Sequence, residues 1–235
     1  DRALYLKLPQ VGKESFEWLV GDLLPGDHVA VVSYDTRLTL HHDFSRDRDR
    51  LGRAIRRATQ GQPPERWPSR TEAPQPGVTL APLFAREDLA EATADLHDAV
   101  RLLAEEMGTI AGRKNLVLFG ADFPRLDSPE SRAGYPAMVE ALNAHNVAAY
   151  GVSVTGRGRQ PSLARLAEDT GGRYAYGFTS FLEPLRRIAV ENSGYYLVSF
   201  RSQVPAGETG YREVAVSTVN ESFEVRTRSG YRYGD

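Results

Sequence analysis

The feature that most constrains this fold is a run of four apolar residues, 116–119, enclosed by Gly112 and Gly120. The run is too short for a helix, and it holds no polar residue that could face water on one side. Such strands occur in parallel sheets whose two faces are both covered by helices. We therefore predict that 116–119 is an interior, central strand. Asp122 then lies at its carboxyl end, where open α/β sheets place their ligand crevices.

Helical and strand-like segments alternate on both sides of this run. Apolar residues at helical spacing predict helices near 10–23, 45–59, 89–107, 135–144, 161–169 and 182–191, the fifth of which is expected to end at Gly171-Gly172. Apolar and β-branched runs predict strands at 29–34, 38–40, 147–154 and 174–176, with 29–32 also in the sheet interior. This alternation predicts the Rossmann-like α/β class, a doubly wound and mostly parallel sheet flanked by helices.

The pattern changes to a period of two near the end of the chain. Residues 195–200, 212–219 and 223–228 are strand-like runs separated by turn-forming residues, which predicts antiparallel pairing. So few residues cannot bury a core of their own. We therefore divide the chain into a domain of residues 1–193 and a small C-terminal antiparallel β extension, 194–235, that packs on it.

Composition excludes several classes of function. The chain has 31 acidic and 29 basic residues, and a net charge of −2 provides no field that would recruit nucleic acid or an anionic membrane. No stretch is apolar over the length that a membrane helix requires, so we expect no membrane insertion, and none has the order of a signal segment. The absence of cysteine excludes disulfides, thiolate metal sites and cysteine nucleophiles.

Five stretches, in this order, resemble the von Willebrand factor type A fold and the bacterial VWFA-related family of the acidobacterial type. They are 23–32, 112–124, 142–152, 166–173, and 193–200 together with 226–231. The last of them resembles the β extension of that bacterial family. The resemblance implies a protein-binding domain outside the cytoplasm, either periplasmic or secreted.

Type A domains commonly carry a metal-ion-dependent adhesion site with the pattern Asp-x-Ser-x-Ser, a Thr in a second loop and an Asp after the fourth strand. Hydroxyl and carboxylate oxygens are the donors that Mg²⁺ prefers. The resemblance places Asp1 at the first Asp, Asp122 at the last, and Thr93 one residue before the Thr position. Ala3 and Tyr5 stand where the family has serines. The resemblance thus implies a degenerate site, and we expect no bound cofactor, with Mg²⁺ as the alternative.

The resemblance also places the first strand of the fold, central in the sheet, upstream of Asp1. Two explanations are open. Either the sequence is a fragment whose opening strand was cut away, or residues 3–8, with alternating leucines, form a strand themselves. The spacing from Pro25-Gly26-Asp27 favours the first.

Other candidate sites are weaker. His41 and His42 are strand neighbours that point to opposite faces and cannot hold one ion together. His97 and Asp98 do not face each other on a helix, and no Gly-x-Ser-x-Gly elbow is present, so catalytic residues are not expected. The repeat at 156–159, Gly-Arg-Gly-Arg, lacks the rest of a phosphate-binding motif.

We therefore predict a non-enzymatic protein-binding or scaffolding module. The alternatives are a Mg²⁺-dependent adhesion or receptor domain and an uncharacterised hydrolase. The partner is expected to contact Asp122, Phe123 and Arg125 at the strand ends, with Trp67 of the proline-rich loop 62–76 beside them. An alternative of equal weight is that Trp67 packs this loop onto the domain and has a structural role.

Overall fold

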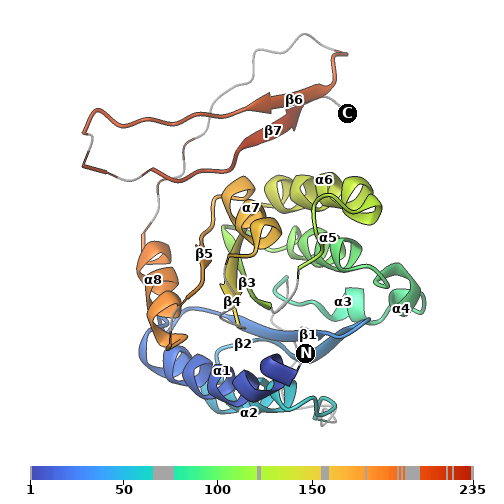
Figure 1. Ribbon diagram of the computed structural model, residues 1–235, viewed down its shortest axis with the longest axis vertical. Helices are drawn as coiled ribbons and strands as arrows, with labels where there is room; N and C mark the ends of the chain where they lie inside the picture. Colours follow the sequence, from blue (N-terminus) through green and yellow to red (C-terminus); the bar gives the residue numbers. More distant parts are fainter. Residues whose placement is uncertain are drawn as a thin grey trace.

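The computed structural model describes residues 2–65, 77–120, 123–154, 159–177, 179–194, 196, 198, 207–220, 222–223 and 225–233. The fold is mixed α/β: a three-stranded parallel sheet flanked by helices, with two small antiparallel sheets (Figure 1). None of the described helices combines the length and the apolar character needed to cross a bilayer.

The parallel sheet consists of β3 (Lys114–Gly120), β4 (Val147–Ser153) and β5 (Tyr174–Ala175), in that order. Strand β4 pairs along its whole length with β3, from Lys114 opposite Val147 to Gly120 opposite Ser153. Every residue of β4 is buried. The most enclosed strand of this sheet is therefore β4.

Alternate residues of β3 and β4 face two separate hydrophobic clusters. Leu116, Leu118, Val147 and Ala149 pack in the cluster that contains α5 (Leu96–Met107), α6 (Pro129–Ala144) and α7 (Pro161–Asp169). The intervening residues pack in the cluster that contains α1 (Arg2–Gly21) and α8 (Leu182–Asn192); they are Val117, Phe119, Ala148, Tyr150 and Val152. Both faces of the apolar run are thus covered, as its sequence predicts.

The first hairpin forms a sheet of its own. Strand β1 (Val29–Tyr34) pairs antiparallel with β2 (Leu38–Ser45), and α2 (Arg48–Thr59) follows them. The prediction that 29–32 and 116–119 are interior strands is wrong for the described sheets, because β1 pairs only with β2 and β3 only with β4. The alternative strand at 3–8 is also wrong, since these residues belong to α1. Consequently no described strand joins β1 to β3.

In place of the predicted helix 89–107, the structure has two helices, α4 (Leu89–Ala92) and α5. The short helix α3 (Ala81–Phe84) precedes both. Helix α5 begins separately because the Asp95 side chain accepts a hydrogen bond from the backbone N–H of His97. An aspartate that caps in this way favours a helix start over a helix interior. The break places residues 93–95 in a turn.

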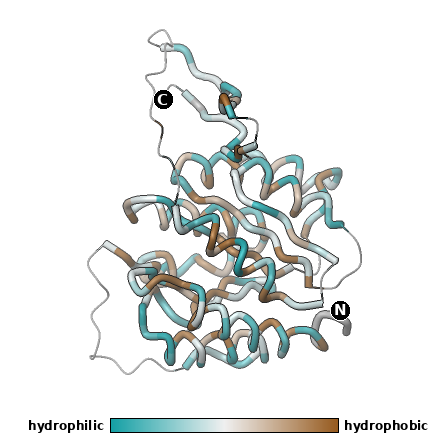
Figure 2. Tube along the Cα trace, turned by 90° about the vertical axis from the view of Figure 1, so that its left-hand side faces the viewer, coloured by the Kyte–Doolittle hydropathy of each residue, from teal (hydrophilic) through white to brown (hydrophobic). Residues whose placement is uncertain are grey.

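The C-terminal segment contains an antiparallel pair, β6 (Gly210–Glu213) and β7 (Gly230–Tyr233). The predicted bounds are wrong: β6 overlaps only the start of 212–219, and β7 lies after 223–228, none of whose described residues is in a strand. Ser229 N–H donates to the Asp169 carbonyl at 3.2 Å, and Arg228 donates to the Asn143 carbonyl at 2.7 Å. These bonds tie the base of the hairpin to α6 and α7. Figure 2 shows the hairpin at one end of the molecule, and both teal and brown residues occur along the helices. Most of the predicted strand 195–200 lies outside the described residues.

His41 in β2 is a buried titratable side chain. It is 6% exposed, its Nε2 lies 2.9 Å from Ser33 Oγ, and its Nδ1 is buried without a hydrogen-bond partner among the described residues. Burial lowers the pKa of His41, the Arg57 charge lowers it further, and Asp35 opposes both. The folded protein therefore binds a proton at His41 less readily than the unfolded chain does.

This difference predicts a pH-dependent stability. The unfolded chain protonates His41 near its ordinary pKa of about 6.5, so the free energy of unfolding should fall as pH drops below that value and level off below the lowered folded pKa. Urea unfolding of the wild type and of His41→Asn, between about pH 7.5 and about pH 5, measures the effect. The variant should lose less stability over this range, and equal losses would contradict the prediction.

Candidate functional site

A shallow, open pocket of about 580 Å³ lies at the end of β1 and beside residues 123–125, which follow β3. We call it the strand-end cavity. Its lining comprises the last residue of β1, the turn before α5 and the segment that follows β3; these residues are Tyr34, Ala94, Asp95, Leu96, Phe123, Pro124 and Arg125. The end of β1 and the segment after β3, which belong to separate sheets, thus meet at one cavity.

Hydrogen bonds hold the wall of the cavity in place. The Tyr34 hydroxyl donates to the Ala94 carbonyl at 2.9 Å, which joins the end of β1 to the turn before α5. Asp95 Oδ1 accepts from His97 N at 2.7 Å and lies 2.9 Å from His97 Nδ1. Burial and the nearby Asp95 charge raise the pKa of Tyr34, so the hydroxyl remains a donor at neutral pH. Asp95 is therefore an acidic residue of the cavity wall, and its contacts with His97 fix its position.

His97 positions the aromatic residues beside the cavity. It is fully buried, and its ring lies edge-on to Phe123 at a centroid distance of 5.8 Å and to Tyr135 at 6.4 Å. This structural role of His97 is not among the sequence-based predictions. The signal for its structural role is the spacing Asp95-x-His97 at a helix start, where the aspartate can cap the helix and meet the ring.

Two predicted partner-binding residues line the strand-end cavity. Phe123 is half-buried there, and the Arg125 side chain is 82% exposed. Arg125 donates two hydrogen bonds to Asp127, at 3.0 and 2.7 Å, and these lower the pKa of the Asp127 carboxyl. Phe123 and Arg125, which follow β3, thus lie on the wall of the cavity, and their partner-binding role stays a prediction.

Of the other predicted site residues, the structure describes only Thr93. Asp1, Trp67 and Asp122 lie outside the described residues. Thr93 is fully buried at the end of α4, and its hydroxyl donates to the Leu89 carbonyl at 2.7 Å. Thr93 is absent from the cavity lining because its backbone closes a helical turn and turns the side chain inward.

The described residues near the strand-end cavity offer few oxygen donors for a metal ion. In the part of the chain that the structure describes, no group of three or more His, Cys, Asp or Glu residues is placed to hold one. Asp95 uses Oδ1 for the contacts with His97, so it offers Oδ2. One carboxylate oxygen is far short of the octahedral set that Mg²⁺ requires. The predicted metal site thus depends on Asp1 and Asp122, and it stays a prediction.

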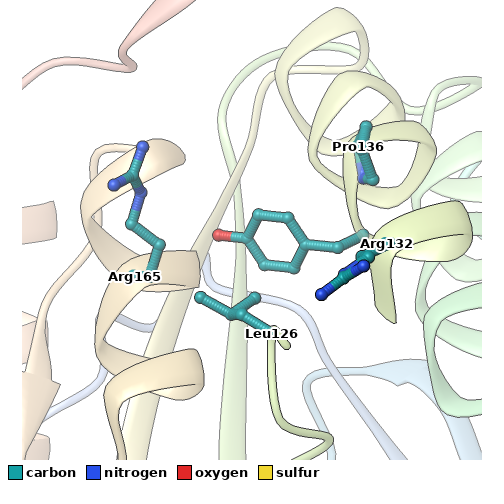
Figure 3. A pocket seen from close by; sticks show the side chains of 5 residues that line it. Leu126, Arg132, Pro136 and Arg165 are labelled. Atoms are coloured by element: carbon teal, nitrogen blue, oxygen red, sulfur yellow. The ribbon is translucent and has the colours of Figure 1, made fainter. Parts of the chain in front are cut away.

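A second, smaller pocket lies next along the chain from the strand-end cavity (Figure 3). It has a volume of about 210 Å³ and is lined by Leu126, Arg132, Tyr135, Pro136 and Arg165. We call it the Tyr135 pocket. The segment after β3 lines both, since residues 123–125 face the first and Leu126 faces the second. His97 packs against an aromatic ring of each.

Comparisons with known proteins leave the class of the protein open. No protein-family profile matches the chain, and no curated protein matches it. Among solved structures, the chain is similar to an uncharacterized membrane spanning protein from Vibrio fischeri, at 14% sequence identity and a TM-score of 0.24. That similarity covers 79% of this chain and 83% of the other. A likeness this weak carries no argument about function.

Proposed function

We propose that this chain is a non-enzymatic protein-binding or scaffolding module of the von Willebrand type A-like class, with a doubly wound arrangement and the strand-end cavity as its binding surface. The observation that supports the proposal is the pairing of half-buried Phe123 with exposed Arg125 on the cavity wall. Aromatic and arginine side chains dominate the binding energy of protein interfaces. From the resemblance, we place the module outside the cytoplasm.

The lining of the cavity suits a peptide chain. Tyr34, Leu96 and Phe123 supply apolar surface, and Asp95 and Arg125 supply charges of opposite sign beside it. An interface of this kind has an apolar centre and a polar rim. A partner segment that places an apolar side chain against Phe123 could meet both charges with its own polar groups.

The proposal predicts that two substitutions weaken binding. Peptides selected from a random-sequence display library on the immobilised protein serve as the probe. Phe123→Ala and Arg125→Glu should each weaken their binding about thirtyfold, the equivalent of roughly 2 kcal/mol for an interface hot spot. Fluorescence anisotropy of labelled peptides measures the affinity, and thermal unfolding checks that each variant is folded.

Arg187→Glu is the matched control, because Arg187 is exposed on α8 and does not line the cavity. It should leave the affinity unchanged. Equal weakening by Arg187→Glu, or peptides that bind both site variants as tightly as the wild type, would contradict the proposal. Each titration is repeated with Mg²⁺ and with EDTA. Binding that requires Mg²⁺ would favour the alternative, a Mg²⁺-dependent adhesion domain.

A further inference from the structure

The geometry of the Tyr135 pocket points to the chemistry of the partner: we propose that the pocket receives an acidic side chain from the peptide whose apolar residue occupies the strand-end cavity. This inference rests on the proposed protein-binding function. It adds a second contact point and a charge preference, neither of which the sequence motifs indicate.

The floor of the pocket is fixed by hydrogen bonds. The Tyr135 hydroxyl donates to Asp169 Oδ2 at 2.8 Å, and Arg165 Nε donates to both carboxylate oxygens of Asp169, at 2.9 and 3.0 Å. The Asp169 carbonyl accepts from Ser229 of the C-terminal segment. Burial and the Asp169 carboxylate raise the pKa of Tyr135, which keeps the hydroxyl protonated. Two helices and the hairpin base thus hold the floor rigid.

The two arginines of the pocket keep donors for a ligand. Arg165 is 61% exposed, and its described hydrogen bonds use only Nε, so its two terminal nitrogens point outward. The backbone N–H of Arg132 donates to the Ser128 carbonyl at 3.1 Å, while its side chain is exposed and has no hydrogen bond or ion pair among the described residues. In Figure 3 the labelled Arg132 and Arg165 side chains lie on two sides of the pocket and come from separate helices. A carboxylate in the pocket would have an arginine on either side.

The acidic side chains described around the pocket already have arginine partners. Asp127 is paired with Arg125, Glu168 with Arg159 at 3.0 Å, and Asp169 with Arg165. The Arg132 charge also helps to lower the pKa of Asp127, without a described ion pair between the two. Two arginines and no acidic residue line the pocket itself, which favours an anion. Guanidinium groups bind carboxylates through strong charge-assisted hydrogen bonds.

The size and position of the pocket favour an acidic side chain over a free small molecule. Its 210 Å³ is below the roughly 300 Å³ at which small-molecule sites begin. Leu126, Pro136 and the Tyr135 ring provide apolar walls for the methylene groups of a glutamate or aspartate. Residues 123–125 line the strand-end cavity and Leu126 lines the Tyr135 pocket, so one extended peptide can fill both pockets. We therefore infer a partner segment with an acidic residue a short distance from an apolar one.

The test uses peptides selected on the wild-type protein from the random-sequence library, and the same peptides resynthesised with each Glu or Asp changed to Gln or Asn. The acidic peptides should bind about tenfold more tightly than their neutral versions. Arg132→Gln should remove that difference by weakening the acidic peptides alone, since a coupled pair shows its interaction energy only when both partners are present. Arg187→Gln should preserve it.

Two results would overturn the inference: selected peptides without an excess of acidic residues, or an Arg132→Gln protein that still prefers the acidic versions. The outcome separates this inference from the proposed function. Peptides that respond to Phe123→Ala but not to Arg132→Gln would retain the function and remove the acidic contact. A library that yields no binding peptide would overturn both.

Discussion

Replacing Gly172 with alanine is expected to destabilise the protein by at least about 3 kcal/mol, enough to lower the melting temperature by roughly 6 to 12 °C. A Cβ on Gly172 would lie 2.0 Å from the Ala149 carbonyl oxygen and 2.7 Å from its carbonyl carbon. Both are backbone atoms of β4, the enclosed strand, so no side-chain rotation can relieve the contact. The strand and the connection from α7 to β5 would have to separate.

Gly21→Ala is the matched control for this prediction. Nothing lies within 4 Å of a Cβ at Gly21, which ends α1. Alanine there should be neutral or should stabilise the protein by up to about 1 kcal/mol, because alanine favours helix over glycine. Urea unfolding of both variants measures the difference. A Gly172→Ala protein as stable as Gly21→Ala would show that β4 and the segment at 172 do not approach closely.

The pair Gly171-Gly172 at the end of α7 shows which features the local sequence could predict. The helix 161–169 was expected to end at Gly171-Gly172, and α7 does end there. Gly171 has φ +73°, and the N–H groups of Gly171 and Gly172 donate to the carbonyls of Glu168 and Ala167, the pattern of a Schellman cap. A cap is local, so its residues identify it. The contact of Gly172 with Ala149 joins distant residues, and no local pattern could indicate it.

The arrangement of the sheets was not predictable from local patterns for the same reason. The run 116–119 is apolar on both faces, which correctly predicts helices on both sides of the sheet. That pattern describes the two faces of a strand and contains no information about its two edges. Which strand hydrogen-bonds to each edge depends on the path of the whole chain. The sequence therefore predicted the cover over β3, and erred on the neighbours of β1 and β3.

The candidate site likewise contains residues that the local sequence could predict and residues that it could not. Phe123 and Arg125 were predicted from their position after a strand, and both line the strand-end cavity. The Tyr135 pocket was missed because its residues come from three segments with no common motif. Thr93 was assigned by a family pattern, but residues 93–95 form the turn between α4 and α5, so the threonine side chain is buried there.

Asp43→Ala is expected to cost roughly 2 to 4 kcal/mol of folding free energy, because it leaves buried donors without an acceptor. Asp43 in β2 is 8% exposed, and its carboxylate accepts three hydrogen bonds. Oδ1 accepts from the N–H groups of Phe44 and Leu80, at 2.8 and 2.9 Å, and Oδ2 accepts from the Thr79 hydroxyl at 2.5 Å. Without this carboxylate, the segment that leads into α3 loses its anchor.

The loss should extend beyond the three hydrogen bonds, because Leu80 and Leu83 are each 2% exposed and pack in the main hydrophobic cluster. Asp43→Asn keeps one acceptor oxygen and should fall between the wild type and the alanine variant. Glu87→Ala, an exposed carboxylate with no hydrogen bond among the described residues, should change stability by less than about 0.5 kcal/mol. Urea unfolding gives the three values, and amide hydrogen exchange at Leu80 reports the anchor directly. If Asp43→Ala leaves that amide protected, then another group holds the segment, and the carboxylate is not its anchor.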